Sequence, residues 1–78
     1  MSHTPHELHE EFPDHLQQLH ALKVSNAHFS KLADEYHEVN RAVHRGETDI
    51  EPLSDQKMSE IRKQRMTLKD QIWSLLNA

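Results

Sequence analysis

The 78 residues suffice for one small domain, and a hydrophobic content of 35% with a mean hydropathy of −0.90 excludes a large closed core. A formal net charge of −4 argues against a dedicated nucleic-acid-binding domain, and the lack of cysteine excludes disulfides and thiolate metal sites. No apolar run approaches the roughly 20 residues of a membrane span, and the first residues lack a signal-peptide pattern, so we expect a cytoplasmic protein without membrane partners.

A short helix is predicted at the N-terminus. Residues 4–7 combine a capping threonine, a proline suited to a first helical turn and a glutamate at the capping-box position. The large apolar side chains of this segment are Leu8 and Phe12, and Pro13 ends the helix. Because so short a helix is unstable by itself, residues 1–13 are expected to form an arm that either docks on the rest of the chain or frays.

Two longer helices follow. The first is predicted over about residues 14–45, where Gly46, the chain's only glycine, would supply a left-handed C-cap. A polar link with one proline covers residues 46–53. Ser54 caps the last helix, which continues to about residue 76 and gives a second predicted element over 54–76.

The apolar residues of these two helices are spaced alternately by three and four, as in the seam of a coiled coil. When the helices are paired antiparallel about the link, four apolar layers fall in one register, and a fifth layer sets Arg65 opposite Tyr36. Residues 14–78 are therefore predicted to form an all-α, antiparallel two-helix coiled-coil-like hairpin. The apolar layers pair Val43 with Met58, Val39 with Ile61, Leu32 with Leu68 and Phe29 with Ile72.

This register leaves two apolar surfaces without a cover. The start of the long helix projects past the end of its partner, and the last helix carries a second apolar stripe beside the seam. Either the N-terminal arm folds over these surfaces or a second copy of the chain packs there in a four-helix arrangement, and we favour self-association. The candidate interaction surface comprises Leu16, Leu19, Leu22, Met66, Trp73 and Leu76.

Several segments carry a resemblance to a known family: Phe-Pro at 12–13, the run over 29–37, residues 41–47 and the segment KQRMTLKDQI at 63–72. The last is the most specific, because a basic residue interrupts the seam and Leu-Lys-Asp follows at fixed spacing. Over about residues 12–76 the chain resembles the YdcH family of small bacterial proteins. The resemblance implies a helical hairpin without an assigned activity, and it brings no catalytic residues.

No catalytic, cofactor or metal site is predicted. The eight histidines include no pair four residues apart that could hold a metal on one helix face, and the predicted seam contains no carboxylate. The chain lacks a grouping of nucleophile, base and orienting residue, and one glycine cannot make a phosphate-binding loop. We therefore expect a protein that is not an enzyme and has no cofactor or small-molecule ligand; a role of the histidines as a pH or metal sensor stays open.

The leading functional prediction is a small protein-interaction module that acts through exposed helix faces, with a second copy or another protein as its partner. The alternative is weak nucleic-acid association through an excess of basic residues on the last helix. Arg65 could pack on Tyr36 with its guanidinium directed to Glu35 or the opposite edge, or it could be held out for a partner's carboxylate or phosphate. Trp73 could be a core contact or the centre of an interface. The candidate basic face comprises Arg62, Lys63, Arg65 and Lys69.

Overall fold

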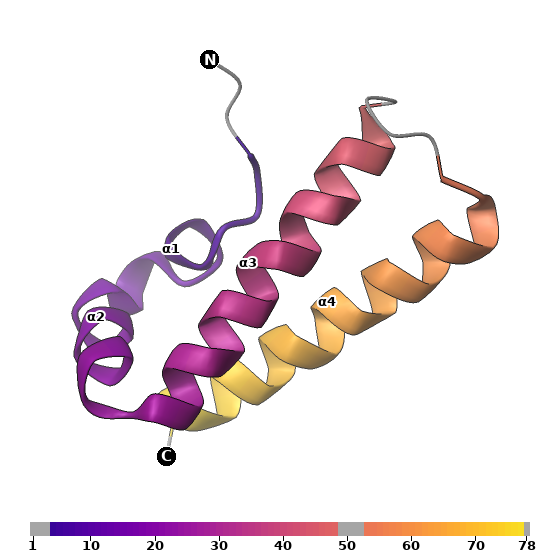
Figure 1. The fold of residues 1–78 in the computed structure, drawn as a ribbon. Coiled ribbons are helices and arrows are strands. Elements are labelled where there is room, and N and C mark those ends of the chain that lie inside the picture. Colours follow the sequence, from indigo (N-terminus) through magenta and orange to yellow (C-terminus); the bar gives the residue numbers. More distant parts are fainter. Residues whose placement is uncertain (1–3, 49–52, 78) are drawn as a thin grey trace.

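The computed structural model describes residues 4–48 and 53–77. In these residues the chain is helical, with no strand, and the all-α hairpin is confirmed: α3 and α4 lie side by side and antiparallel, while the N-terminal elements fold back along them (Figure 1). No helix among the described residues is long and apolar enough to cross a bilayer. The elements are α1 (Leu8–Glu11), a 3₁₀ turn η1 (Pro13–His15), α2 (Leu16–Ser25), α3 (Ala27–Glu47) and α4 (Asp55–Leu76).

The hairpin is held by two apolar clusters that contain the predicted layers. Near the link, Val43 packs with Met58 and Ile61. Along the rest of the hairpin, a larger cluster joins the apolar side chains of α3 and α4 to those of the N-terminal segment. Each fully buried aliphatic or aromatic side chain contributes roughly 1.5–3 kcal/mol. Members of the larger cluster are Phe12, Leu19, Phe29, Leu32, Ala33, Tyr36, Leu68, Ile72 and Leu76.

The prediction of one continuous helix over 14–45 is wrong, because the chain bends at Asn26. This residue is extended, with φ −129° and ψ 106°, and its side-chain oxygen accepts a hydrogen bond of 3.1 Å from the Phe29 N–H. Asparagine is among the best N-cap residues, so α3 begins afresh after the bend. The bend brings α2 back to the hairpin, where Leu19 becomes buried.

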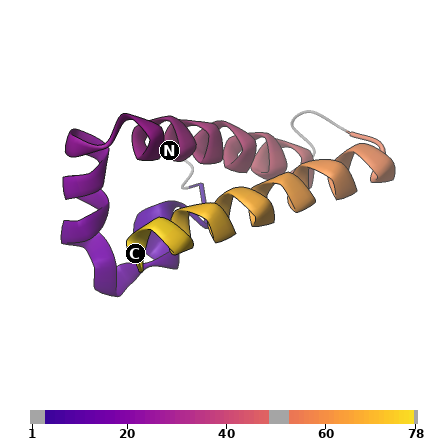
Figure 2. The same ribbon diagram turned by 90° about the horizontal axis from the view of Figure 1, so that it is seen from below.

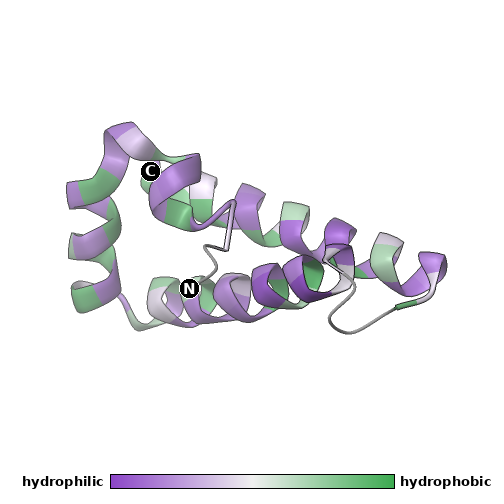
Figure 3. Ribbon diagram, turned by 90° about the horizontal axis from the view of Figure 1, so that it is seen from above, coloured by the Kyte–Doolittle hydropathy of each residue, from purple (hydrophilic) through white to green (hydrophobic). Residues whose placement is uncertain are grey.

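The overhang predicted for the start of the long helix is therefore absent. Figure 2 shows α2 lying across the open end of the hairpin, between the start of α3 and the end of α4. Leu19 and Leu76 are buried there, and Leu22 packs against the same cluster. Figure 3 shows hydrophobic and hydrophilic residues mixed along α3 and α4, as expected of helices with one buried face.

Two other terminus predictions have different outcomes. Ser54 does cap α4, since its hydroxyl oxygen accepts from the Lys57 N–H at 3.1 Å. Gly46 does not form a left-handed C-cap: its φ is not positive, and α3 continues to Glu47. A Cβ at Gly46 would overlap the Met58 sulfur, so a larger residue at this position would require the Met58 side chain to move.

Candidate interaction site

Residues 4–13 of the N-terminal arm dock on the hairpin, and residues 1–3 lie outside the described part of the chain. The Tyr36 hydroxyl donates a hydrogen bond of 2.6 Å to the carbonyl oxygen of His6. The Asn40 side-chain amide donates one of 2.8 Å to the carbonyl oxygen of Pro5. His37 Nδ1 lies 3.2 Å from a carboxylate oxygen of Glu7. Between docking and fraying, which the sequence left open, the structure shows docking.

Asn40 is the polar residue that the sequence reasoning missed. It is completely buried, and its side-chain oxygen accepts a hydrogen bond of 3.1 Å from Arg65 Nη1. The guanidinium of Arg65 therefore binds Asn40, and the predicted contact of this guanidinium with Glu35 is wrong. Spacing could have pointed to Asn40, because it lies four residues after Tyr36 and three before Val43, on the buried face of α3.

A second contact ties the arm to α4. Lys69 Nζ donates a hydrogen bond of 2.8 Å to Glu11, and His6 lies 3.6 Å from the other carboxylate oxygen. The hydrogen bond and charge of Lys69 lower the pKa of Glu11 despite partial desolvation. Burial, followed by the nearby charge of Glu11, raises the pKa of Tyr36 to about 12. The arm is therefore attached to both helices of the hairpin.

The arm also supplies an aromatic contact to α4. The rings of Phe12 and Trp73 stack with their centroids 5.4 Å apart and their planes 8° apart. His15 meets Trp73 edge-on at 5.3 Å, and Lys69 Nζ lies 5.9 Å from the centroid of the Phe12 ring. Phe12 is buried by this arrangement, whereas Trp73 stays 43% exposed.

Two hollows lie where the N-terminal segment meets α4, and both are lined by Lys69 and Glu11. One has a volume of about 410 Å³ and the other about 280 Å³. Both include Lys69 and Glu11, so they form one interrupted depression, which we call the α4 groove. Its remaining lining residues are Phe12, Pro13, Asp14, His15, Asp70 and Trp73 on one side and His6, Tyr36, Arg62, Arg65 and Met66 on the other.

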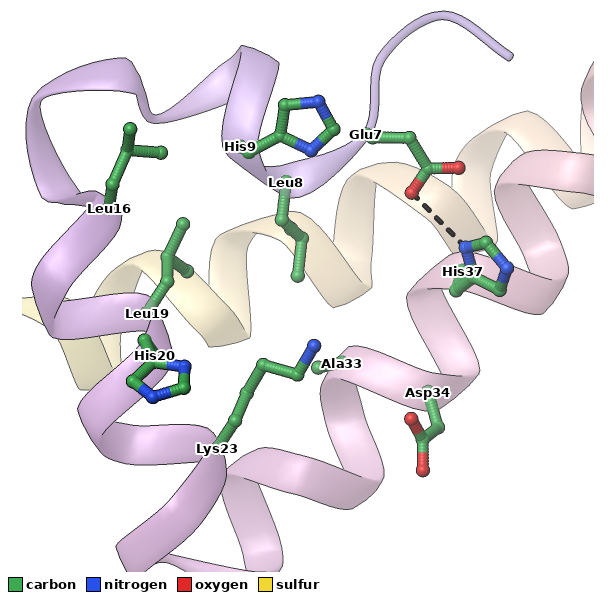
Figure 4. A pocket seen from close by; sticks show the side chains of 10 residues that line it. All are labelled: Glu7, Leu8, His9, Leu16, Leu19, His20, Lys23, Ala33, Asp34 and His37. Atoms are coloured by element: carbon green, nitrogen blue, oxygen red, sulfur yellow. Dashed lines mark hydrogen bonds and ion pairs between the residues drawn. The ribbon is translucent and has the colours of Figure 1, made fainter. Parts of the chain in front are cut away.

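A third hollow, of about 420 Å³, lies among the arm, α2 and α3 (Figure 4). Leu8, Leu16, Leu19 and Ala33 supply apolar side chains, and the Glu7–His37 pair lies at one edge. Three histidines line this hollow, but the described part of the chain holds no group of three or more His, Asp or Glu side chains arranged to bind a metal ion. The polar lining residues are Glu7, His9, His20, Lys23, Asp34 and His37.

The predicted interaction surface is only partly on the outside. Met66 is 60% exposed and Leu16 51%, and Trp73 is exposed on one side. Leu19 and Leu76 do not belong to a surface, because both lie in the larger apolar cluster, and Leu22 is half-buried against it. Folding back at Asn26 covers the residues that the straight helix would have left bare.

The predicted basic face is engaged by the chain itself at three of its four positions. Arg62 pairs with Glu47 at 3.0 Å and Lys69 with Glu11, while Arg65 is bound to the neutral side chain of Asn40. Lys63 is exposed. Among the three engaged cations, Arg65 is bound to a neutral amide, whereas Arg62 and Lys69 are bound to carboxylates.

The comparison with known proteins concerns the hairpin. The sequence pattern of a protein family of unknown function (DUF465) matches residues 29–76, which span nearly all of α3 and the whole of α4. No curated protein and no solved structure matches the chain. Because the match covers more than half of the sequence, the chain belongs to this family of unknown function, DUF465.

Proposed function

We propose that the protein is a non-enzymatic interaction module that binds an acidic amphipathic helix of another protein along the α4 groove. The observation that carries this proposal is the exposure of Met66 and Trp73 on one face of α4. They are seven residues apart, which is roughly 10 Å along a helix axis. A partner helix with apolar residues one heptad apart would meet both side chains.

One cation of the groove supports an acidic partner. Lys69 is already paired with Glu11, but at the Met66 end of the groove the hydrogen bond of the Arg65 guanidinium goes to a neutral amide. An arginine fork can hold a carboxylate through two parallel hydrogen bonds. Lys63 adds a further positive charge close to Met66 in the sequence. A glutamate-rich helix therefore matches the groove better than a basic one.

Trp73 suits the centre of such an interface. One side of its ring is held by Phe12 and His15, which reduces the conformational entropy that binding would cost. A partly covered, oriented tryptophan beside a hollow is typical of residues that contribute most to binding energy. The YdcH resemblance and a cytoplasmic location stay predictions.

The nucleic-acid alternative has less support. Arg62 and Lys69 are already paired with carboxylates of the same chain, and the net charge of −4 opposes binding to phosphates. Binding to nucleic acid would show a steep loss of affinity with added salt.

The proposal is tested with two synthetic amphipathic peptides that share one apolar heptad pattern, one with Glu and the other with Lys at the flanking positions. The emission of Trp73, the single tryptophan, reports binding directly. We expect a saturable blue shift with the acidic peptide alone. Met66→Ser should weaken binding about tenfold, because the lost apolar contact contributes about 1.5 kcal/mol or more.

Val24→Ser is the matched control, since Val24 is also an exposed apolar residue but lies on α2. It should leave the affinity for the acidic peptide unchanged. Equal binding of both peptides, equal loss with both variants, or no response of Trp73 to the acidic peptide would refute the proposal. A single-stranded DNA titration in parallel identifies the nucleic-acid alternative.

A further inference from the structure

One residue separates α2 from α3. Ser25 ends the first helix, Ala27 begins the second, and Asn26 between them is extended. No glycine or proline stands at this bend. The N–H of Asn26 still donates a hydrogen bond of 2.9 Å to the carbonyl oxygen of Leu22, as in a continuous helix. A change in the backbone dihedrals of this residue alone would convert the bent chain into one long helix.

The straight form has its own stabilisation. In a continuous helix, the backbone N–H groups at the start of α3 would donate hydrogen bonds to the carbonyl groups at the end of α2, and the bend prevents these bonds. The residues around Asn26 include no helix breaker, which is why the sequence predicts a continuous helix there. The bent form is favoured instead by the Asn26 cap on Phe29 and by the contacts of the arm and α2 with the hairpin.

Straightening would remove residues 4–25 from their own hairpin. It would uncover Phe29, Leu32 and Ile72, whose large apolar side chains are buried in the same cluster as Phe12 and Leu19. The same N-terminal segment of a second copy would cover those residues with the contacts that the closed chain already makes. Its carboxylates Glu7 and Glu11 would again find His37 and Lys69.

We propose that Asn26 is a hinge through which two copies of the chain exchange residues 4–25 and form a swapped dimer. Exchange of an identical element is a low-cost route to dimers, because every contact of the closed monomer is made again between the copies. The closed monomer keeps the advantage of a tethered segment, whose effective concentration is of millimolar order. The swapped dimer therefore forms at high protein concentration or when the hinge favours the helix. This inference does not rest on the proposed function, since the α4 groove is rebuilt with Phe12 of the second copy.

Two substitutions move the hinge in opposite directions. Asn26→Ala removes the cap on Phe29 and raises helix propensity, so it favours the straight form. Ala27→Pro favours the bend: proline suits the first position of a helix, the residue before it prefers the extended backbone that Asn26 already has, and a continuous helix through it is broken. Ser54→Ala is the matched control, because it removes an equivalent cap from α4 without touching the hinge.

Sedimentation equilibrium measures the dimer fraction at protein concentrations from about 10 µM to 1 mM. This range is chosen because the tethered segment, with an effective concentration of about millimolar, competes there with the segment of a second copy. We expect Asn26→Ala to dimerise at a concentration at least tenfold lower than the wild type and Ser54→Ala, and Ala27→Pro to stay monomeric. Asn26→Ala that dimerises no better than Ser54→Ala would overturn the proposal, as would Ala27→Pro that dimerises like the wild type.

The site of exchange is read from a mixture of isotope-labelled and unlabelled Asn26→Ala protein. In the swapped dimer, filtered nuclear Overhauser effects connect the Phe12 ring of one copy to the Trp73 ring of the other, because these rings stack in the closed chain. A dimer in which the Phe12–Trp73 contact stays within one chain would show association through another surface and would contradict the exchange.

Discussion

Replacing Asn40 with alanine should destabilise the fold more than its modest size suggests. Three hydrogen bonds would be lost: the acceptor for Arg65 at 3.1 Å, and the donors to Pro5 at 2.8 Å and Glu7 at 3.3 Å. A neutral hydrogen bond contributes about 1 kcal/mol and one to a charged group about 1.5–3 kcal/mol. Because the 3.3 Å contact with Glu7 is long and weak, we count only the bonds to Pro5 and Arg65 and expect a loss of about 3 kcal/mol. Small domains have only about 5–15 kcal/mol in total.

Urea unfolding followed by circular dichroism measures this loss, and the melting temperature should fall by about 12–24 °C at 4–8 °C per kcal/mol. Gln64→Ala, an exposed polar position of α4, is the control and should change stability by less than about 0.5 kcal/mol. A cost below about 1 kcal/mol for Asn40→Ala would refute the role of Asn40 as the link between arm and hairpin. Adding Arg65→Leu should recover part of the loss, because the half-buried guanidinium then no longer lacks its partner.

Three further predictions concern single residues. Gly46→Ala should destabilise by about 1–3 kcal/mol in urea unfolding despite its better helix propensity, because its Cβ overlaps Met58; equal or higher stability would contradict the packing. Tyr36, the single tyrosine, should ionise near pH 12 in an absorbance titration of the folded protein. The stability that its neutral form contributes is lost as the pH rises from 10 toward 12. Ionisation at pH 10 in the folded protein would exclude its buried hydrogen bond. Because the pKa of Glu11 is lowered from its ordinary value of 4.5, its ionised form stabilises the fold above pH 4.5, and this contribution is lost as the pH falls through the pKa of the folded protein. The stability difference between wild type and Lys69→Met should therefore be present at neutral pH and vanish in acid. A difference that does not depend on pH would count against the ion pair.

The hairpin could be predicted because the spacing of apolar residues is repeated along both helices. Each layer of the seam repeats the same spacing, and Ser54 marks the start of α4 by its chemistry alone. Gly46 was recognised as special but for the wrong reason, because the close approach of Met58 is a property of the packed helices and not of the local sequence. Local patterns identify elements well and their tertiary neighbours poorly.

The bend and the docked arm could not be predicted in the same way. Asn26 is compatible with both a helix interior and an N-cap, and the choice depends on whether Leu19 finds a partner on the hairpin. The arm is held by backbone carbonyl groups of Pro5 and His6, which every sequence possesses. Because of this folding back, Leu19 and Leu76 moved from the candidate surface to the core, while Met66 and Trp73 remained outside.

The most direct test of the account is a nuclear Overhauser measurement on dilute wild-type protein, where the chain is monomeric. The docked arm predicts strong contacts between the ring protons of Phe12 and Trp73, whose centroids lie 5.4 Å apart. Absence of the Phe12–Trp73 contacts in the folded wild-type chain would contradict the docked arm, and the α4 groove would then have no second wall.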